Sequence, residues 1–142
     1  MNSSINRLFK YLFLGWFGGS TYATTEVLYR GYSHWTMVIL GSIVFILLGG
    51  LNKFIPWSLG FIQQVLIGTF IVTLLEFATG CIVNIWLGWH VWDYSNMDFN
   101  ICGQVCPQFI LAWIPLVVIA IVSDDLIRWK FFGEEKPHYK LI

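Results

Sequence analysis

Residues 54–75 read FIPWSLGFIQQVLIGTFIVTLL and contain no Asp, Glu, Lys or Arg. Two further stretches, residues 31–52 and residues 99–123, also lack all four of these residue types. An apolar run of about 18 or more residues is long enough to cross a bilayer as a helix. These three stretches therefore indicate a membrane protein that crosses the bilayer more than once.

The composition of the whole chain agrees with this class. Hydrophobic residues make up 57% of the 142 residues and charged residues only 11%, whereas a soluble domain has about 45–50% apolar and about 25% charged residues. A soluble enzyme domain is therefore excluded. Eight basic and eight acidic side chains cancel, so no basic surface is available for nucleic acid. The three cysteines match neither a disulfide framework nor a zinc spacing, and we expect buried free thiols.

The charges, glycines and prolines around the apolar stretches predict where the helices begin and end. Four membrane spans are expected, at about residues 9–29, 35–51, 57–82 and 106–123. The predicted fold is an all-α, four-transmembrane-helix bundle that forms a single integral membrane domain over residues 1–142.

The distribution of basic residues predicts how this bundle lies in the membrane. With four spans, Arg30 alone falls on one side, and seven basic residues fall on the other: Arg7, Lys10, Lys53, Arg128, Lys130, Lys136 and Lys140. Cytoplasmic segments carry the excess of Lys and Arg, so we expect both termini in the cytoplasm. Asp124 and Asp125 lie at the cytoplasmic end of the last span and are expected to face water.

One segment does not fit a plain span. Residues 77–98 contain five aromatic residues together with several polar ones. Non-helical backbone at membrane depth survives only when it is packed in protein or lines water, and Trp and Tyr bury large areas. We therefore expect an ordered external loop at residues 84–105, either a cap or a re-entrant loop; the alternative is a mobile external loop.

Four acidic residues are expected on or towards the external side: Glu26, Glu76, Asp93 and Asp98. Ionisable groups at membrane depth cost several kcal/mol unless they are paired or hydrated, so they are functional candidates. In one interpretation, Glu26 and Glu76 converge with Asp93 on a cation or on a protonated group of a solute. In the other, Arg30 or His90 pairs with one of them and the rest face water.

The residues around Glu76 strengthen its candidacy. Glu76, Gly80 and Asn84 recur every four positions, so they share a face on which another helix can approach closely. Gly15 and Gly19 give the first helix a similar packing face. Packing accounts for the glycines, but it accounts for neither Glu76 nor Asn84.

Three motifs in the second half of the chain carry a family resemblance. In order, they are Glu76-x-x-x-Gly80-x-x-x-Asn84, Trp92-Asp93-Tyr94-Ser95 and Asn100-x-x-Gly103-Gln104-Val105-Cys106. Over about residues 70–113 the sequence resembles the bacterial membrane family called putative ABC-transporter type IV, whose members are also described as CmpB-type permeases. One departure is Asp98, where the family pattern has proline. The resemblance implies a permease-like subunit in the bacterial inner or plasma membrane.

The leading hypothesis is a small permease-like or transporter component with an acidic pocket on its external side for a cationic or polar solute. The candidate residues for binding a solute or ion are Glu76, Asn84, Asp93, Glu26, Tyr94, Asn100 and Gln104. No catalytic residue, metal ligand or cofactor is predicted. The sequence has no G-x-x-x-x-G-K-[ST] loop, so a role in ABC transport requires a separate ATPase. Four short helices leave little room for a pathway, which favours a homo-oligomer or another membrane subunit.

Other functions stay open from the sequence. A non-transport interaction module, such as a sensor, assembly factor or effector, would use the same helices to bind another membrane protein. An interfacial enzyme that acts on lipid would use His90 and Asp93, but no nucleophile or metal set accompanies them. A membrane-permeabilising protein of the holin sort also fits the size. An enzyme is therefore the less favoured interpretation.

Overall fold

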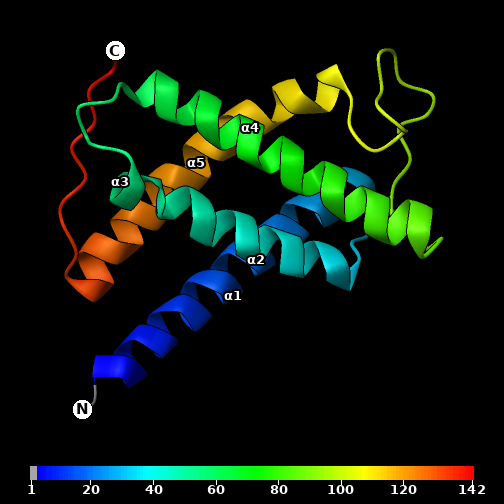
Figure 1. Cartoon of the computed structure of the whole chain (residues 1–142). Coiled ribbons are helices and arrows are strands. Elements are labelled where there is room, and N and C mark those ends of the chain that lie inside the picture. The colour runs from blue at the N-terminus through cyan, green and yellow to red at the C-terminus, as the bar shows by residue number, and fades with distance from the viewer. Residues whose placement is uncertain (1–2) are drawn as a thin grey trace.

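The protein is all-α, as expected. The computed structural model describes residues 3–142 (Figure 1), which form helices α1 (Ser3–Arg30), α2 (Trp35–Gly49), α3 (Leu51–Phe54), α4 (Phe61–Gly80) and α5 (Pro107–Phe132) and a π-helix, η1 (Cys81–Trp86). Within these residues the only β pairing is an isolated bridge between Ile101 and Val105. Helix α2 is central, because it contacts α1, α4 and α5.

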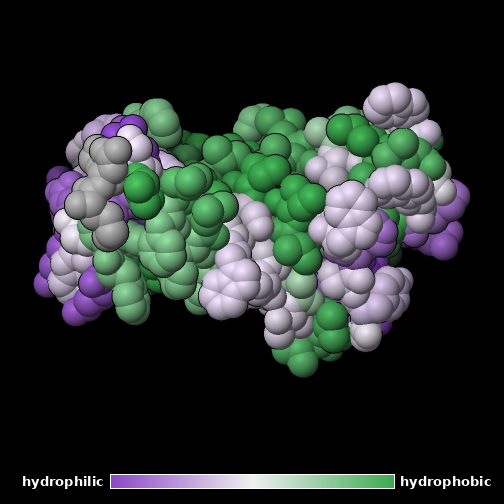
Figure 2. Space-filling view, turned by 90° about the horizontal axis from the view of Figure 1, so that it is seen from below, coloured by the Kyte–Doolittle hydropathy of each residue, from purple (hydrophilic) through white to green (hydrophobic). Residues whose placement is uncertain are grey.

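Three helical segments are long and apolar enough to cross a membrane: Trp35–Phe54, Phe61–Trp86 and Pro107–Phe132. The expected fourth span, residues 9–29, falls in α1, which is not apolar enough to join them. This stretch holds glycines, serine, several threonines and Glu26, which together lower its hydropathy. On the face in Figure 2, hydrophobic side chains occupy the middle and the most hydrophilic ones gather at the two ends.

Local sequence explains where two of the helices begin and end. The ring nitrogen of His34 accepts a hydrogen bond from the backbone N–H of Thr36 (3.3 Å) and caps α2. Pro107 occupies the first turn of α5, where its missing N–H needs no partner. Gly133 ends α5 with its backbone in the left-handed region (φ 64°). The helix therefore runs to Phe132, beyond the end of the predicted span at residue 123.

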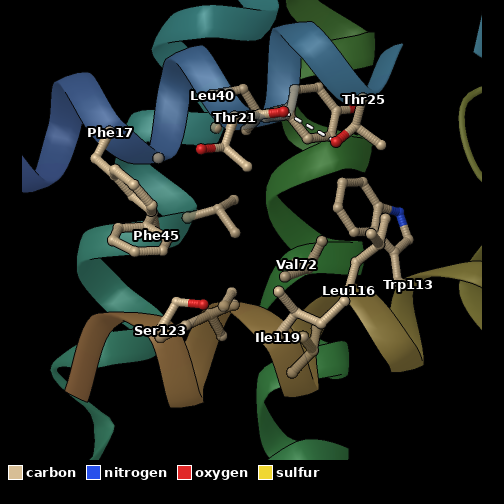
Figure 3. A pocket seen from close by; sticks show the side chains of 17 residues that line it. Phe17, Thr21, Thr25, Leu40, Phe45, Val72, Trp113, Leu116, Ile119 and Ser123 are labelled. Carbon is tan, nitrogen blue, oxygen red and sulfur yellow. Dashed lines mark hydrogen bonds between the residues drawn. The ribbon is translucent and has the colours of Figure 1, made fainter. Parts of the chain in front are cut away.

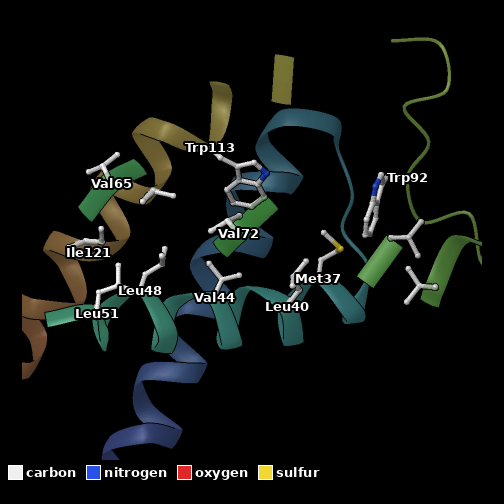
Figure 4. Packing of buried hydrophobic residues seen from close by; sticks show 13 residues of the cluster. Met37, Leu40, Val44, Leu48, Leu51, Val65, Val72, Trp92, Trp113 and Ile121 are labelled. Atoms are coloured by element: carbon white, nitrogen blue, oxygen red, sulfur yellow. The ribbon is translucent and has the colours of Figure 1, made fainter. Parts of the chain in front are cut away.

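The hydrophobic core forms where α2 faces α4 and α5. Figure 4 shows the buried side chains of α2 in a row along one face of the helix: Met37, Leu40, Val44 and Leu48. This row meets Val72 on α4 and Trp113 and Ile121 on α5.

Glycines let α1 lie directly on α2. A Cβ added at Gly18 would lie 2.2 Å from the Cβ of Phe45, and one at Gly19 would lie 2.4 Å from the hydroxyl of Ser42. That hydroxyl donates a hydrogen bond to the backbone carbonyl of Gly15 (2.7 Å). The glycine face predicted for the first helix therefore packs against its neighbour, as expected.

Asp124 and Asp125 are buried, so the expectation that they face water was wrong. Asp124 is 0% exposed and pairs with Arg128, one helical turn further along α5. Asp125 accepts hydrogen bonds from the amide of Asn52 (3.1 Å) and the phenol of Tyr139 (2.5 Å). Because these charges find partners inside the protein, α5 continues through them.

The last ten residues lie across the beginning of α4. The backbone carbonyl of Lys140 accepts a hydrogen bond from the N–H of Phe61 (2.6 Å), which would otherwise have no partner at a helix start. The ring of His138 stacks on Trp57 with centroids 4.5 Å apart. Near the other end of the chain, the ammonium of Lys10 bonds to Glu134 (2.5 Å). Both ends of the chain therefore lie at one end of the molecule (Figure 1).

Candidate functional site

Glu76 lies on α4 with its carboxylate inside the protein. Its exposed fraction is 3%. One carboxylate oxygen accepts a hydrogen bond from the phenol of Tyr94 (3.2 Å), and the other accepts one from the indole N–H of Trp113 (2.9 Å). Within residues 3–142 no basic side chain forms an ion pair with it. Both donors are uncharged, so the carboxylate has hydrogen bonds but no counter-ion.

A cavity of about 430 Å³ lies beside Glu76. Helices α1, α2, α4 and α5 line it together with the loop of residues 87–106 that joins η1 to α5. Glu26 also lines it, so two of the predicted acidic residues share one cavity. We call this space, with Glu76, Glu26, Arg30 and Tyr94 in its wall, the acidic cavity.

Glu26 differs from Glu76 because it has a basic partner. It forms an ion pair with Arg30, one turn further along α1, and accepts a hydrogen bond from the hydroxyl of Ser33 (2.6 Å). Arg30 in turn donates to the backbone carbonyl of Val91 (2.9 Å), which ties α1 to the loop. The acidic residues were expected either to converge on a cation or to pair with Arg30 or His90. For Glu26 the structure shows pairing with Arg30.

Asn84 and Gln104 hold the loop that carries Tyr94. The amide of Asn84, in η1, donates to the side-chain oxygen of Gln104 (2.8 Å) and accepts from the backbone N–H of Val91 (2.7 Å). A Cβ at Gly80 would lie 2.4 Å from the same Gln104 oxygen. The loop therefore packs on Gly80 and Asn84, whereas at Glu76 helix α5 also approaches this face, through Trp113.

Asp93 and Asn100 lie away from the acidic cavity. Asp93 is exposed and accepts hydrogen bonds from the hydroxyl and the backbone N–H of Ser95 (2.8 Å for the latter), and these bonds hold the pKa of its carboxyl below the usual value. Asn100 bonds the backbone of Met97 (2.9 Å) and Gly103 (2.8 Å). Both residues shape the loop, and Asp93 does not meet the two glutamates.

Tyr94 remains a hydrogen-bond donor in this site. Burial raises the pKa of its phenol, and the charge of the nearby Glu76 raises it further. Its ring stacks on Phe109 of α5, with centroids 4.4 Å apart and planes 10° apart. The loop, α4 and α5 therefore meet at this one side chain.

Sequence reasoning missed two aromatic residues of the site. Trp113 donates to Glu76, and Tyr22 stacks on Trp113 with centroids 5.5 Å apart. Trp113 stands in an apolar run with nothing to mark it as polar, whereas Tyr22 lies four residues before Glu26 and so on the same face of its helix. The cysteines are free, as expected, but only Cys106 is buried, and Cys102 is exposed.

These features define the class of the protein. Three of its helices are long and apolar enough to cross a bilayer, and hydrophilic side chains gather at the two ends of the molecule. The protein is therefore a helical membrane protein. Residues 7–132 match the family model described as "Putative ABC-transporter type IV", and the chain belongs to this family. The match includes α1 and α2, well beyond the motifs at residues 70–113. No curated protein and no solved structure matches the chain.

Proposed function

We propose that the protein is a small permease-like membrane component that binds a cationic or polar solute at Glu76. One observation carries the proposal: a buried carboxylate with two uncharged donors and no ion-pair partner in the described residues stands in the wall of a cavity of about 430 Å³. An ionised group without a counter-ion costs several kcal/mol in such surroundings. A cationic group in the acidic cavity supplies the missing charge.

Uptake into liposomes tests this proposal. The purified protein, with any subunit that co-purifies, is reconstituted and given radiolabelled methylammonium, the smallest protonated alkylamine. Glu76→Gln keeps the shape and one of the two acceptor oxygens but removes the charge, and we expect it to abolish uptake. Glu135→Gln is the matched control, because that side chain is 66% exposed and lies at the opposite end. Uptake that survives in Glu76→Gln would refute the role of this carboxylate.

We also propose that α1 lies in the bilayer with the three apolar helices, so that both termini are cytoplasmic. Lys10, Lys53 and Arg128 gather around Glu134 at one end of the molecule, and basic residues favour the cytoplasmic side. Cys102 is an exposed thiol in the loop at the other end. A membrane-impermeant maleimide should label Cys102 in intact cells, and a thiol introduced by Lys140→Cys only after permeabilisation. The reverse pattern would invert the orientation.

The family suggests a partner that this chain lacks. We propose a separate ATPase subunit and a second copy of the chain or another membrane subunit, because no nucleotide-binding loop is present in the sequence. Native mass spectrometry after purification in mild detergent from the native membrane tests this. A stoichiometric ATPase supports the ABC role. A different membrane partner, without solute flux, would favour the interaction-module function.

A further inference from the structure

A second cavity, of about 180 Å³, lies between α1 and α5. In Figure 3, α1 passes on one side of it and α5 on the other, with α2 and α4 behind. Apolar side chains make up most of its wall, among them Phe17, Leu40, Phe45, Val72 and Ile119. We call this space the apolar cavity.

The apolar cavity adjoins the acidic cavity. Both are lined by the same four residues: Tyr22, Thr25, Trp113 and Leu116. The stacked rings of Tyr22 and Trp113 therefore stand where one space gives way to the other, and Trp113 also holds Glu76. The two cavities therefore lie next to each other, and one has acidic surroundings and the other hydrocarbon-like ones.

The charges of the acidic cavity favour one kind of head group. Glu26 balances the charge of Arg30, which also donates a hydrogen bond to the loop, although the Nε of Arg30 has no hydrogen-bond partner in the part of the chain that the structure describes. Glu76 has no counter-ion among the described residues. With Glu76 ionised, two carboxylates against one guanidinium leave one negative charge, which a single protonated amine balances.

We propose that the two cavities form one site for a single-chain amphiphile, with a protonated amine at Glu76 and its alkyl chain in the apolar cavity. This inference rests on the proposed function and specifies its solute. Glu26 lines the acidic cavity and Phe17 the apolar cavity. They are nine residues apart on α1, which is about 14 Å along the helix. The combined site is therefore long enough for an extended alkyl chain and longer than methylammonium. An alkyl chain in the apolar cavity gains dispersion interactions with the side chains that line it.

Photo-crosslinking tests the position of the chain directly. The probe is dodecylamine with a diazirine at the end of its alkyl chain, added to the full-length protein in lipid nanodiscs, with labelled residues mapped by mass spectrometry. We expect labelling at residues of the apolar cavity such as Phe17, Phe45 and Ile119. Unlabelled dodecylamine should compete at least about tenfold better than dodecanol, which has the same chain without the charge.

Substitutions in the two cavities distinguish binding of the alkyl chain from binding of the amine head group. Ala120→Phe or Ser123→Leu fills the apolar cavity and should abolish labelling there, whereas Ala78→Phe, on an exposed part of α4, should not. Glu76→Gln should abolish the advantage of dodecylamine over dodecanol.

Three results would overturn the inference: labelling spread over lipid-facing residues such as Leu66, equal competition by dodecanol, or labelling unchanged by both filling variants. If methylammonium uptake still depends on Glu76 in that case, the proposed function stands and only the amphiphile is refuted. If Glu76→Gln leaves uptake intact, the proposed function itself fails.

Discussion

Removal of one hydroxyl tests whether Glu76 carries a negative charge in the folded protein. In Tyr94→Phe the ring keeps its stacking on Phe109, so the hydrogen bond to Glu76 is the main interaction that the substitution removes. A hydrogen bond to a charged group contributes about 1.5–3 kcal/mol, and one between neutral groups about 0.5–1.5 kcal/mol. The oxygen–oxygen distance of 3.2 Å is long for such a bond. We therefore expect the free energy of unfolding to fall by about 1.5 kcal/mol if Glu76 is ionised.

The assay is equilibrium unfolding of the full chain in mixed micelles with a rising fraction of sodium dodecyl sulfate, followed by circular dichroism. Tyr29→Phe is the control, since Tyr29 also meets Phe109 edge-on but is exposed, and its effect should stay within about 0.5 kcal/mol. In a Glu76→Gln background the loss of stability from Tyr94→Phe should fall by about half. Equal losses for the two tyrosines would refute the reasoning.

Three further variants test the packing around the site and at the other end of the molecule. Arg128→Leu leaves the buried Asp124 carboxylate unpaired and should lower the free energy of unfolding by about 3–5 kcal/mol in the same titration, and adding Asp124→Asn should recover part of this loss. Burial raises the pKa of Glu134, but the hydrogen bond from Lys10 and the nearby basic charges outweigh burial and hold the pKa below its usual value. Ionised Glu134 therefore stabilises the fold fully above its unfolded pKa of about 4.3 and loses this effect as pH falls through the lowered folded pKa. Thermal melts of Glu134→Gln and wild type should therefore converge as the pH falls from about 4.3 through that lowered value. Gly80→Ala puts a Cβ 2.4 Å from a loop amide oxygen and should lower stability by about 1–3 kcal/mol with faster hydrogen exchange in the loop, and unchanged exchange would contradict this.

The apolar helices were predictable because the bilayer imposes a simple rule on length and charge. Residues 31–52, 54–75 and 99–123 fall largely within the three segments that can cross a membrane. The prediction was less accurate at residues 9–29, where an interrupted apolar pattern suggested a fourth span. It also stopped α5 at the first acidic residue. A charge pair one turn apart neutralises itself within the helix, and Asp124 and Arg128 have that spacing.

The site was predictable from its charges but not from its contacts. Glu76 was recognised because a lone carboxylate in an apolar helix needs an explanation. Its donors Tyr94 and Trp113 lie 18 and 37 residues away, and only the packing of the loop and α5 on α4 brings them near. For the same reason, Asp93 was placed in the site by its charge, whereas the turn at Ser95 directs it elsewhere.

The distance in sequence between Glu76 and its donors has a consequence for biogenesis. During synthesis α4 leaves the ribosome before Tyr94 and Trp113, the latter 37 residues later. Helix α4 must therefore partition into the bilayer with its carboxylate unsatisfied, a penalty of about 2.5–3.5 kcal/mol for an acidic residue such as Asp at a helix centre. The apolar residues around it have to offset this penalty until α5 arrives, so the order of insertion limits how polar α4 can be.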